Sequence, residues 1–351
     1  MSICKKIEKK LQNYPYALFA LRCIRRIAIR DIDYISFALN EYSNPKRISI
    51  KSLGEENRGG IIYCINELGR GCGFFAEFRT LLCYLIFAEE MGFVPNVFWG
   101  NHHLYYDKDI AYTDNVFEYY FEPIKAEDFR QSLNVCFSSV LQYHYVEKEY
   151  GVNGYSTSED FEEKLVQMIK KYIHIRPELI CDFEIEMNQV LCRGNVLGIH
   201  HRGTDYKKGY REHPKGMQIE QGIAQAKKIL QEYSLDNIFL ATDDEEILDA
   251  YKVAFGEMVH YYPDVKRGLT DVSVAFSQEN RECHHYTLGR EVLRDVYTLS
   301  KCTCLLSGKS QVSYCANLLN RCGENRYLKY ELIDNGINDT GAFFKVERMD
   351  K

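Results

Sequence analysis

The second half of the chain alternates between short apolar runs and longer amphipathic stretches. Short apolar runs predict buried strands, whereas apolar positions spaced three and four residues apart predict helices. Strands are predicted at residues 196–199, 237–241, 258–262 and 302–306, and helices at 217–233, 245–255, 286–300 and 312–321. Because regular alternation of strand and helix is typical of a parallel sheet, we expect an α/β fold here.

The first half is less regular, with one long stretch that has no clear periodicity. Strands are predicted at 61–65 and 94–99, helices at 74–91, 159–175 and 178–190, and irregular structure at 101–155. A chain of 351 residues is long enough for two domains. We therefore expect an N-terminal domain (1–193), a second domain (194–322) and a tail (323–351) that packs back on the first domain.

Composition restricts the class of protein. Hydrophobic residues make up 46% and charged residues 27%, as in ordinary globular proteins. The net charge of -6 argues against a nucleic-acid binder, which needs a basic excess.

Thirteen scattered cysteines without a CxxC pair indicate reduced thiols, and the early apolar run at 16–21 is too short for a signal peptide or a membrane span. We expect a cytoplasmic protein.

The first thirty residues are strongly basic. They carry eight Lys or Arg against one acid, Glu8, and Arg22, Arg26 and Arg30 share one helical face. One interpretation is that helices within residues 1–40 rest on anionic lipid at the inner face of the membrane. The other is a solvated basic face on a docked helix.

Three polar turns each follow an apolar strand of the second half. They contain His200, Arg202 and Asp205 in the first, Asp243 in the second and Ser310 in the third. In a parallel sheet such turns open on one edge, where α/β proteins bind ligands. Because an Arg offers a planar fork of donors that matches a phosphate, we expect the first turn to hold the diphosphate of a sugar nucleotide.

Other phosphate and metal motifs are incomplete. The turn with Gly69 and Gly71 is spaced GxGxG rather than GxGxxG, so it either faces the active site or only lets a helix pack tightly on a strand. Gly308-Lys309-Ser310 lacks the first glycine of a P-loop. Asp243-Asp244 can hold a metal, but we favour a helix cap at Asp244 and a ribose contact at Asp243. The pairs His102-His103 and His284-His285 are assigned to loops, and no metal or other cofactor is expected.

The three turns together resemble a known family. Residues 200–205 resemble the His-x-Arg-Arg-x-Asp stretch of the α1,6-fucosyltransferases, including the rhizobial nodulation enzyme, and of the protein O-fucosyltransferases. Residues 239–244 look like the family's second motif. Residues 293–295, 299–300 and 310–312 look like its third, and residues 69–73 are similar to its glycine-rich turn.

The resemblance implies a GT-B fold, with two Rossmann-like domains facing across a cleft. It also implies an inverting, metal-independent transfer of fucose from GDP-fucose. By this resemblance, Arg202 binds the β-phosphate together with Ser310. His200 and Asp295 bind the guanine base. The remaining positions assigned to the donor site are Asp243 near the ribose, Gln311, Gly69 and Gly71.

The chain departs from the family pattern at the catalytic base. The second Arg of the motif is Gly203, and the position of the family's acid is Tyr210. Glu212 is the nearest carboxylate and becomes the candidate base, while Asp205 orients Arg202 or its loop. A buried salt bridge between Arg202 and Asp205, with no role in catalysis, is the alternative.

The leading hypothesis is a GDP-fucose-dependent glycosyltransferase that acts on a glycan acceptor in bacterial surface polysaccharide or lipopolysaccharide synthesis. A non-catalytic nucleotide-sugar-binding protein is the first alternative, because the family's acid is absent. A transferase that uses another GDP-sugar is the second.

Overall fold

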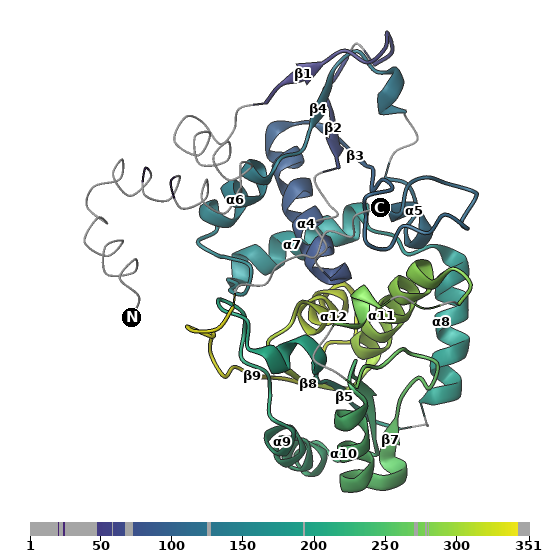
Figure 1. Ribbon diagram of the computed structural model, residues 1–351, viewed down its shortest axis with the longest axis vertical. Coiled ribbons are helices and arrows are strands. Elements are labelled where there is room, and N and C mark those ends of the chain that lie inside the picture. Colours follow the sequence, from purple (N-terminus) through teal and green to yellow (C-terminus); the bar gives the residue numbers. More distant parts are fainter. Residues whose placement is uncertain are drawn as a thin grey trace.

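The computed structural model describes residues 20, 24, 48–57, 59–66, 73–124, 128–191, 194–269, 273–277, 279 and 281–342. Within these residues the protein is α/β, with two separate sheets that lie one above the other in Figure 1. The basic segment 1–30, apart from two of its residues, lies outside the described residues. The same is true of Gly69 and Gly71.

The first sheet has the strand order β1-β4-β2-β3. Strand β2 runs parallel to β3 and β4, and β1 is antiparallel to β4. The strands span Ile50–Lys51 (β1), Ile62–Ile65 (β2), Val94–Val97 (β3) and Val135–Phe137 (β4). Helix α4 (Phe74–Met91) follows β2 and is buried over most of its length, in keeping with its largely apolar sequence.

Residues 101–155 are not irregular throughout, so that prediction was wrong in part. They contain α5 (Phe117–Tyr120), β4 and α6 (Val140–Glu149). Strand β4 is only three residues long, and α6 has a weakly amphipathic sequence, so neither has a clear periodic signal. Both elements are stabilised by tertiary contacts, β4 with β2 and α6 with α4.

The second sheet has the order β7-β6-β5-β8-β9 and is parallel throughout. Its strands are β5 (Val196–His200), β6 (Asn237–Ala241), β7 (Val259–His260), β8 (Cys304–Gly308) and β9 (Lys329–Ile333). Its helices are α9 (Ile219–Glu232), α10 (Glu245–Phe255), α11 (His284–Lys301) and α12 (Gln311–Cys322). The chain moves outward from β5 to β7 and then returns to the other side of β5 at β8. This reversal is a topological switch point, where α/β proteins bind ligands.

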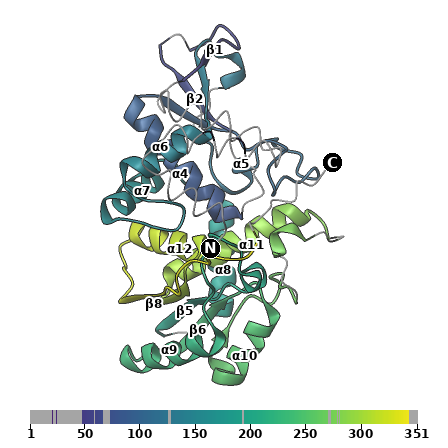
Figure 2. The ribbon, with the colours of Figure 1, turned by 60° about the vertical axis from the view of Figure 1, so that its left-hand side comes forward.

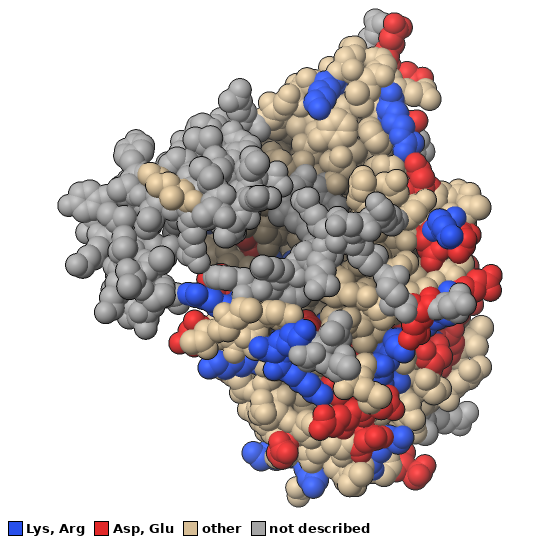
Figure 3. Space-filling model, in the orientation of Figure 1, with Lys and Arg blue, Asp and Glu red and all other residues tan. Residues whose placement is uncertain are grey.

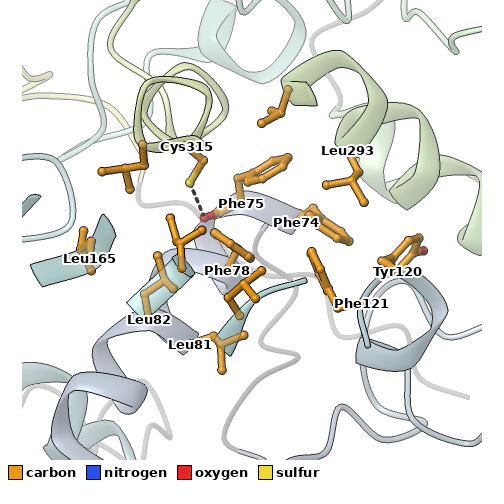
Figure 4. Close-up of a cluster of buried hydrophobic side chains, with 14 of the residues drawn as sticks. Phe74, Phe75, Phe78, Leu81, Leu82, Tyr120, Phe121, Leu165, Leu293 and Cys315 are labelled. Atoms are coloured by element: carbon orange, nitrogen blue, oxygen red, sulfur yellow. Dashed lines mark hydrogen bonds between the residues drawn. The ribbon is translucent and has the colours of Figure 1, made fainter. Parts of the chain in front are cut away.

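Two cores flank the second sheet. One lies between the sheet and the helices α9 and α10. The other joins α11 and α12 to α4, α7 (Glu159–Tyr172) and α8 (Pro177–Val190) of the first half. Figure 2 shows α11 and α12 between α4 and the second sheet, and Figure 4 shows Leu293 and Cys315 facing Phe74 and Phe75. One buried cluster therefore crosses the predicted boundary at residue 193.

The C-terminal segment is part of the second sheet. Strand β9 pairs with β8 in parallel register, from Cys304 with Lys329 to Gly308 with Ile333. Residues 329–333 of the predicted tail thus pair with the second sheet, and the packing of the tail on the first domain stays a prediction. Its alternating sequence Lys-Tyr-Glu-Leu-Ile fits the open edge of β8.

In the part of the chain that the structure describes, no helix has the length and apolar character needed to cross a bilayer. On the face drawn in Figure 3, acidic and basic side chains of the described residues are interspersed. Turns of 3-10 type complete the fold at Phe129–Gln131, Thr204–Lys208, Gly256–Met258 and Val274–Phe276.

Candidate functional site

Three neighbouring strands of the second sheet end side by side. His200, the last residue of β5, is in register with Ala241 of β6 and with Ser307 of β8. The turns that follow these strands therefore open on one edge, as the sequence predicted. This edge includes the switch point between β5 and β8.

Arg202 occupies the first of these turns and is held by three side chains. Its Nη1 lies 2.8 Å from Asp243 Oδ2, and its Nη2 lies 2.8 Å from Asp205 Oδ1. Nη2 also donates to Ser273 Oγ at 3.1 Å. Burial alone lowers the pKa of Arg202, but the two carboxylates raise it above its ordinary value, so the charge is permanent. The side chain is 24% exposed, and its Nε–H and one Nη1 hydrogen have no partner among the described residues.

Two carboxylates of the second turn fix the backbone of the first. Asp243 Oδ1 accepts the N–H of Gly203 at 2.9 Å, and Asp244 Oδ2 accepts the N–H of Thr204 at 3.1 Å. Asp244 Oδ1 also caps α10 by accepting the N–H of Ile247, which confirms the predicted cap. Burial raises the pKa of Asp243, but the charge of Arg202 and the hydrogen bonds from the first turn together outweigh burial. The net pKa lies below its ordinary value, so this carboxyl is ionised. Its contact with a ribose stays a prediction.

Gly203 stands where the family motif has an Arg, and its surroundings exclude a side chain. A Cβ at this position would lie 2.3 Å from the Cβ of Asp244. The next residue, Thr204, has φ +28°, a conformation that is unfavourable for a β-branched side chain. The turn is therefore packed so closely against the second turn that only glycine fits.

His200 and Ser310 lie next to each other at the switch point. His200 Nδ1 is 3.4 Å from Ser310 Oγ, and this hydroxyl caps α12 by accepting the N–H of Val312. Burial, reinforced by the charge of Arg202, lowers the pKa of His200 to about 3, so the imidazole is neutral. Gln311 begins α12 and donates to Gly154 O, and its Oε1 is buried without a hydrogen-bond partner among the described residues.

Asp295 lies on α11, which packs against β5 and β6. It is 9% exposed, and among the described residues no hydrogen bond or ion pair reaches its carboxylate. Burial raises its pKa to about 7, although Arg294 and Arg267 oppose this shift. A buried carboxyl with a strongly shifted pKa and no structural partner is typical of a functional position.

Glu212 lies in a tight turn beyond the first polar turn. Its side chain is exposed and its φ is +67°. The turn is closed by a hydrogen bond of 3.1 Å from the N–H of His213 to Tyr210 O. The ring of His213 is near those of Tyr210 and Tyr155, at centroid distances of 5.9 and 5.7 Å. Sequence reasoning did not single out His213, although it follows the site motif by only a few residues.

His201, His103 and His284 contact neighbouring groups of the fold. His201 Nε2 lies 2.8 Å from Met217 O, and its Nδ1 lies 3.2 Å from Tyr251 Oη. His103 stacks on Trp99. His284 and His285 begin α11, so their assignment to a loop was wrong. Among the described residues, no group of three or more metal-ligating side chains is arranged to hold a metal ion.

Comparison with known proteins gives structural neighbours only. No family model and no curated protein matches the sequence. The structure is similar to NodZ alpha-1,6-fucosyltransferase from Bradyrhizobium, with 16% identity, a TM-score of 0.45 and coverage of 75% of this chain and 94% of that one. It is also similar to POFUT1 in complex with GDP, with 11% identity, a TM-score of 0.45 and coverage of 79% and 99%.

Proposed function

We propose that the protein is an inverting glycosyltransferase of GT-B type, which transfers fucose from GDP-fucose to a glycan acceptor. The observation that carries the proposal is the placement of Arg202. Its guanidinium lies beside the switch point, is fixed by two carboxylates, and keeps two N–H donors for an anion. The motifs in the three turns support GDP-fucose as the donor, and surface polysaccharide or lipopolysaccharide synthesis is the proposed setting.

This site is best suited to stabilising the leaving group of the reaction. When the glycosidic bond breaks, negative charge builds up on the departing diphosphate. Arg202 is already in place, so it stabilises this charge without reorganising. The hydroxyl of Ser310 and the first amides of α12 lie at the same edge, where a helix N-terminus favours an anion.

The donor's base is assigned to His200 and Asp295. A carboxylate accepts the N–H groups of guanine, and a neutral imidazole can donate or accept a hydrogen bond. The carboxylate of Asp243 pairs with Arg202 and the first turn, so we propose that it positions Arg202 together with Asp205 and also lies near the ribose. Gln311 faces the same region from α12, and the proposed contribution of Gly69 and Gly71 lies outside the described residues.

The acceptor must lose a proton as it attacks the sugar. A base on the face opposite the diphosphate takes this proton while the sugar becomes oxocarbenium-like. The turn 210–213 carries the exposed carboxylate of Glu212, which is the proposed base. Glu212 is the group that the sequence favoured.

Thermal-shift ranking of GDP-fucose, GDP-mannose and UDP-sugars tests the donor, followed by an assay of GDP release with glycan acceptors. We expect GDP-fucose to stabilise the protein most, and turnover to persist in EDTA. Preference for another GDP-sugar would keep the enzyme and change its donor. Preference for UDP-sugars would contradict the proposal.

A non-catalytic nucleotide-sugar-binding protein is the second candidate. Two observations favour it: Asp205 and Asp243 both pair with Arg202, and Tyr210 stands where the family motif has an acid. Tight binding of GDP-fucose with neither transfer nor hydrolysis would favour this function.

A further inference from the structure

The first and third turns of the candidate site are joined by a tyrosine that no motif assigns. Tyr206 lies four residues after Arg202, and its side chain reaches the third turn. We propose that Tyr206 is a positioning residue, which fixes the guanidinium of Arg202 relative to the N-terminus of α12 so that both act on one diphosphate. This inference rests on the proposed transferase function and adds a residue to its leaving-group site.

The hydroxyl of Tyr206 provides the contact between the two turns. It donates to the carbonyl oxygen of Lys309 at 3.0 Å, and Lys309 directly precedes Ser310, the cap of α12. The neighbouring contact from His200 Nδ1 to Ser310 Oγ is longer, at 3.4 Å. Burial raises the pKa of Tyr206 far above its ordinary value, so the hydroxyl keeps its proton and remains a donor.

The backbone and the ring of Tyr206 belong to the surroundings of Arg202. The N–H of Tyr206 donates to Gly203 O at 2.9 Å, within the turn that carries Arg202. The guanidinium carbon of Arg202 lies over the ring of Tyr206, 6.0 Å from its centroid, a separation at which an aromatic face still attracts a cation. The same side chain therefore lies beside the cation with its ring and reaches the third turn with its hydroxyl.

The acceptor of this hydrogen bond is itself tied to the second sheet. Lys309 follows the last residue of β8, and its Nζ lies 2.6 Å from Oδ2 of Asp334, just beyond β9. The hydrogen bond with Lys309 is the main cause that lowers the pKa of Asp334, so this carboxyl is ionised and the pair is charged at neutral pH. Tyr206 thus connects Arg202 to a residue that is held at its side chain as well as by its strand.

The second turn lies on the wrong side of β5 to replace this link. Asp243 and Asp244 fix the first turn through two of its backbone N–H groups, but they follow β6, whereas the third turn follows β8 on the other side of β5. The position of Arg202 relative to α12 therefore depends on contacts across the switch point. Tyr206 supplies the shorter of the two such contacts described above.

The spacing between Arg202 and α12 matters because both are assigned to the same leaving group. A guanidinium and a helix N-terminus stabilise the charge on a departing diphosphate only if both are aimed at it before the reaction. A displacement of about 1 Å in such a site can cost about 10²-fold in rate. Without its hydroxyl, Tyr206 would leave both groups present but their spacing less well fixed. The rate of bond cleavage should then fall more than the affinity for the donor.

The test compares Tyr206→Phe with Tyr327→Phe. Each change removes a hydroxyl that donates to a backbone carbonyl, but Tyr327 donates to Leu299 O at 2.9 Å and precedes β9, at the opposite end of the sheet from the three turns. GDP release from GDP-fucose is measured with a bacterial polysaccharide as acceptor, and stability by thermal denaturation. We expect Tyr206→Phe to lose about tenfold in kcat while KM for GDP-fucose changes less than about twofold. Tyr327→Phe should lose similar stability and keep both kinetic constants.

A double variant separates positioning from a purely structural role. If Tyr206 acts through Arg202, Tyr206→Phe should cost less than about twofold in kcat once Arg202 is replaced by Ala. An unchanged kcat in Tyr206→Phe, a raised KM with kcat kept, or the full loss in the Arg202→Ala background would overturn this role and leave the transferase function standing. A wild type that binds GDP-fucose without releasing GDP would overturn both.

Discussion

Asp243, just beyond β6, holds the guanidinium of Arg202, just beyond β5, through an Oδ2–Nη1 contact of 2.8 Å. The same carboxylate accepts the backbone N–H of Gly203 at 2.9 Å. One side chain therefore fixes both the charge and the backbone of the turn that we assign to the diphosphate. A site whose donors are fixed before the ligand arrives stabilises a developing charge more effectively than a flexible one.

Replacement of Asp243 by Asn should weaken this arrangement. The amide can still accept from Gly203, but it no longer pairs with Arg202, which leaves a partly buried cation with one carboxylate fewer. We expect about 2–3 kcal/mol less stability in urea denaturation, below the 3–5 kcal/mol of a fully buried pair. We also expect about tenfold slower GDP release. Asp249→Asn is the control, because its ion pair with Lys252 is exposed and should contribute less than about 0.5 kcal/mol. Equal effects of the two variants would show that Asp243 does not position Arg202.

Gly203→Ala should be strongly unfavourable. The added methyl group would lie 2.3 Å from Asp244 Cβ, so the two turns would have to separate. Overpacking of this kind costs about 1–3 kcal/mol and should displace Arg202 as well. Gly59→Ala is the matched control, because nothing lies within 4 Å of its added Cβ. Thermal melting of both variants measures the difference, and a neutral Gly203→Ala would contradict the packing described above.

Asp295→Asn should stabilise the protein and weaken nucleotide binding. Above pH 7 the wild-type carboxylate is ionised in a buried position, because its folded pKa of about 7 lies far above its ordinary value. Removal of this charge should add up to about 4 kcal/mol at pH 8, since each pKa unit corresponds to about 1.4 kcal/mol. If Asp295 binds guanine, calorimetry should show weaker GDP binding at the same time. Higher stability with unchanged GDP affinity would remove Asp295 from the donor site.

The protein without bound nucleotide should lose stability as the pH falls below about 6.5. The folded pKa values of His103, His200 and His201 are lowered to about 3, 3 and 4, mainly by burial. Between pH 4 and 6.5 the unfolded chain therefore binds more protons at these residues, which disfavours folding by about 1.4 kcal/mol per group and pH unit. The folded pKa of Asp295 is raised, so over this pH range Asp295 binds more protons in the folded state. Its effect on stability is opposite to that of the histidines and cancels about one of the three contributions. Denaturation at pH 6.5 and 5.5 measures the net slope, and greater stability at pH 5.5 would contradict the burial of these imidazoles.

Much of the second half could be predicted from sequence because its signals are local. The bounds of β6 and α10 were predicted correctly. Strand β6 is a short apolar run, and α10 is an amphipathic helix that begins after its cap, Asp244. The shared edge of the three turns follows from parallel pairing alone. Helix α4 was also predicted correctly, because a Gly at each end and a continuous apolar pattern define it.

The rest depends on contacts between distant segments. Strand β9 belongs to the second sheet because it fits the edge of β8, which no local pattern reveals. The cluster that joins Leu293 and Cys315 to α4 likewise depends on tertiary packing. The surroundings of His213 likewise include Tyr155, far away in the sequence, and the C-terminal segment around Asn338.

The central claim is that the guanidinium of Arg202 stabilises the departing diphosphate. The most direct test is the turnover number for GDP release from GDP-fucose by Arg202→Ala, with Arg202→Lys as the variant that keeps the charge but loses the planar fork. Folding is checked by circular dichroism. We expect kcat to fall by about 10²–10³ in Arg202→Ala, with a smaller loss in Arg202→Lys. A folded Arg202→Ala variant that loses less than about threefold in kcat would contradict the claim.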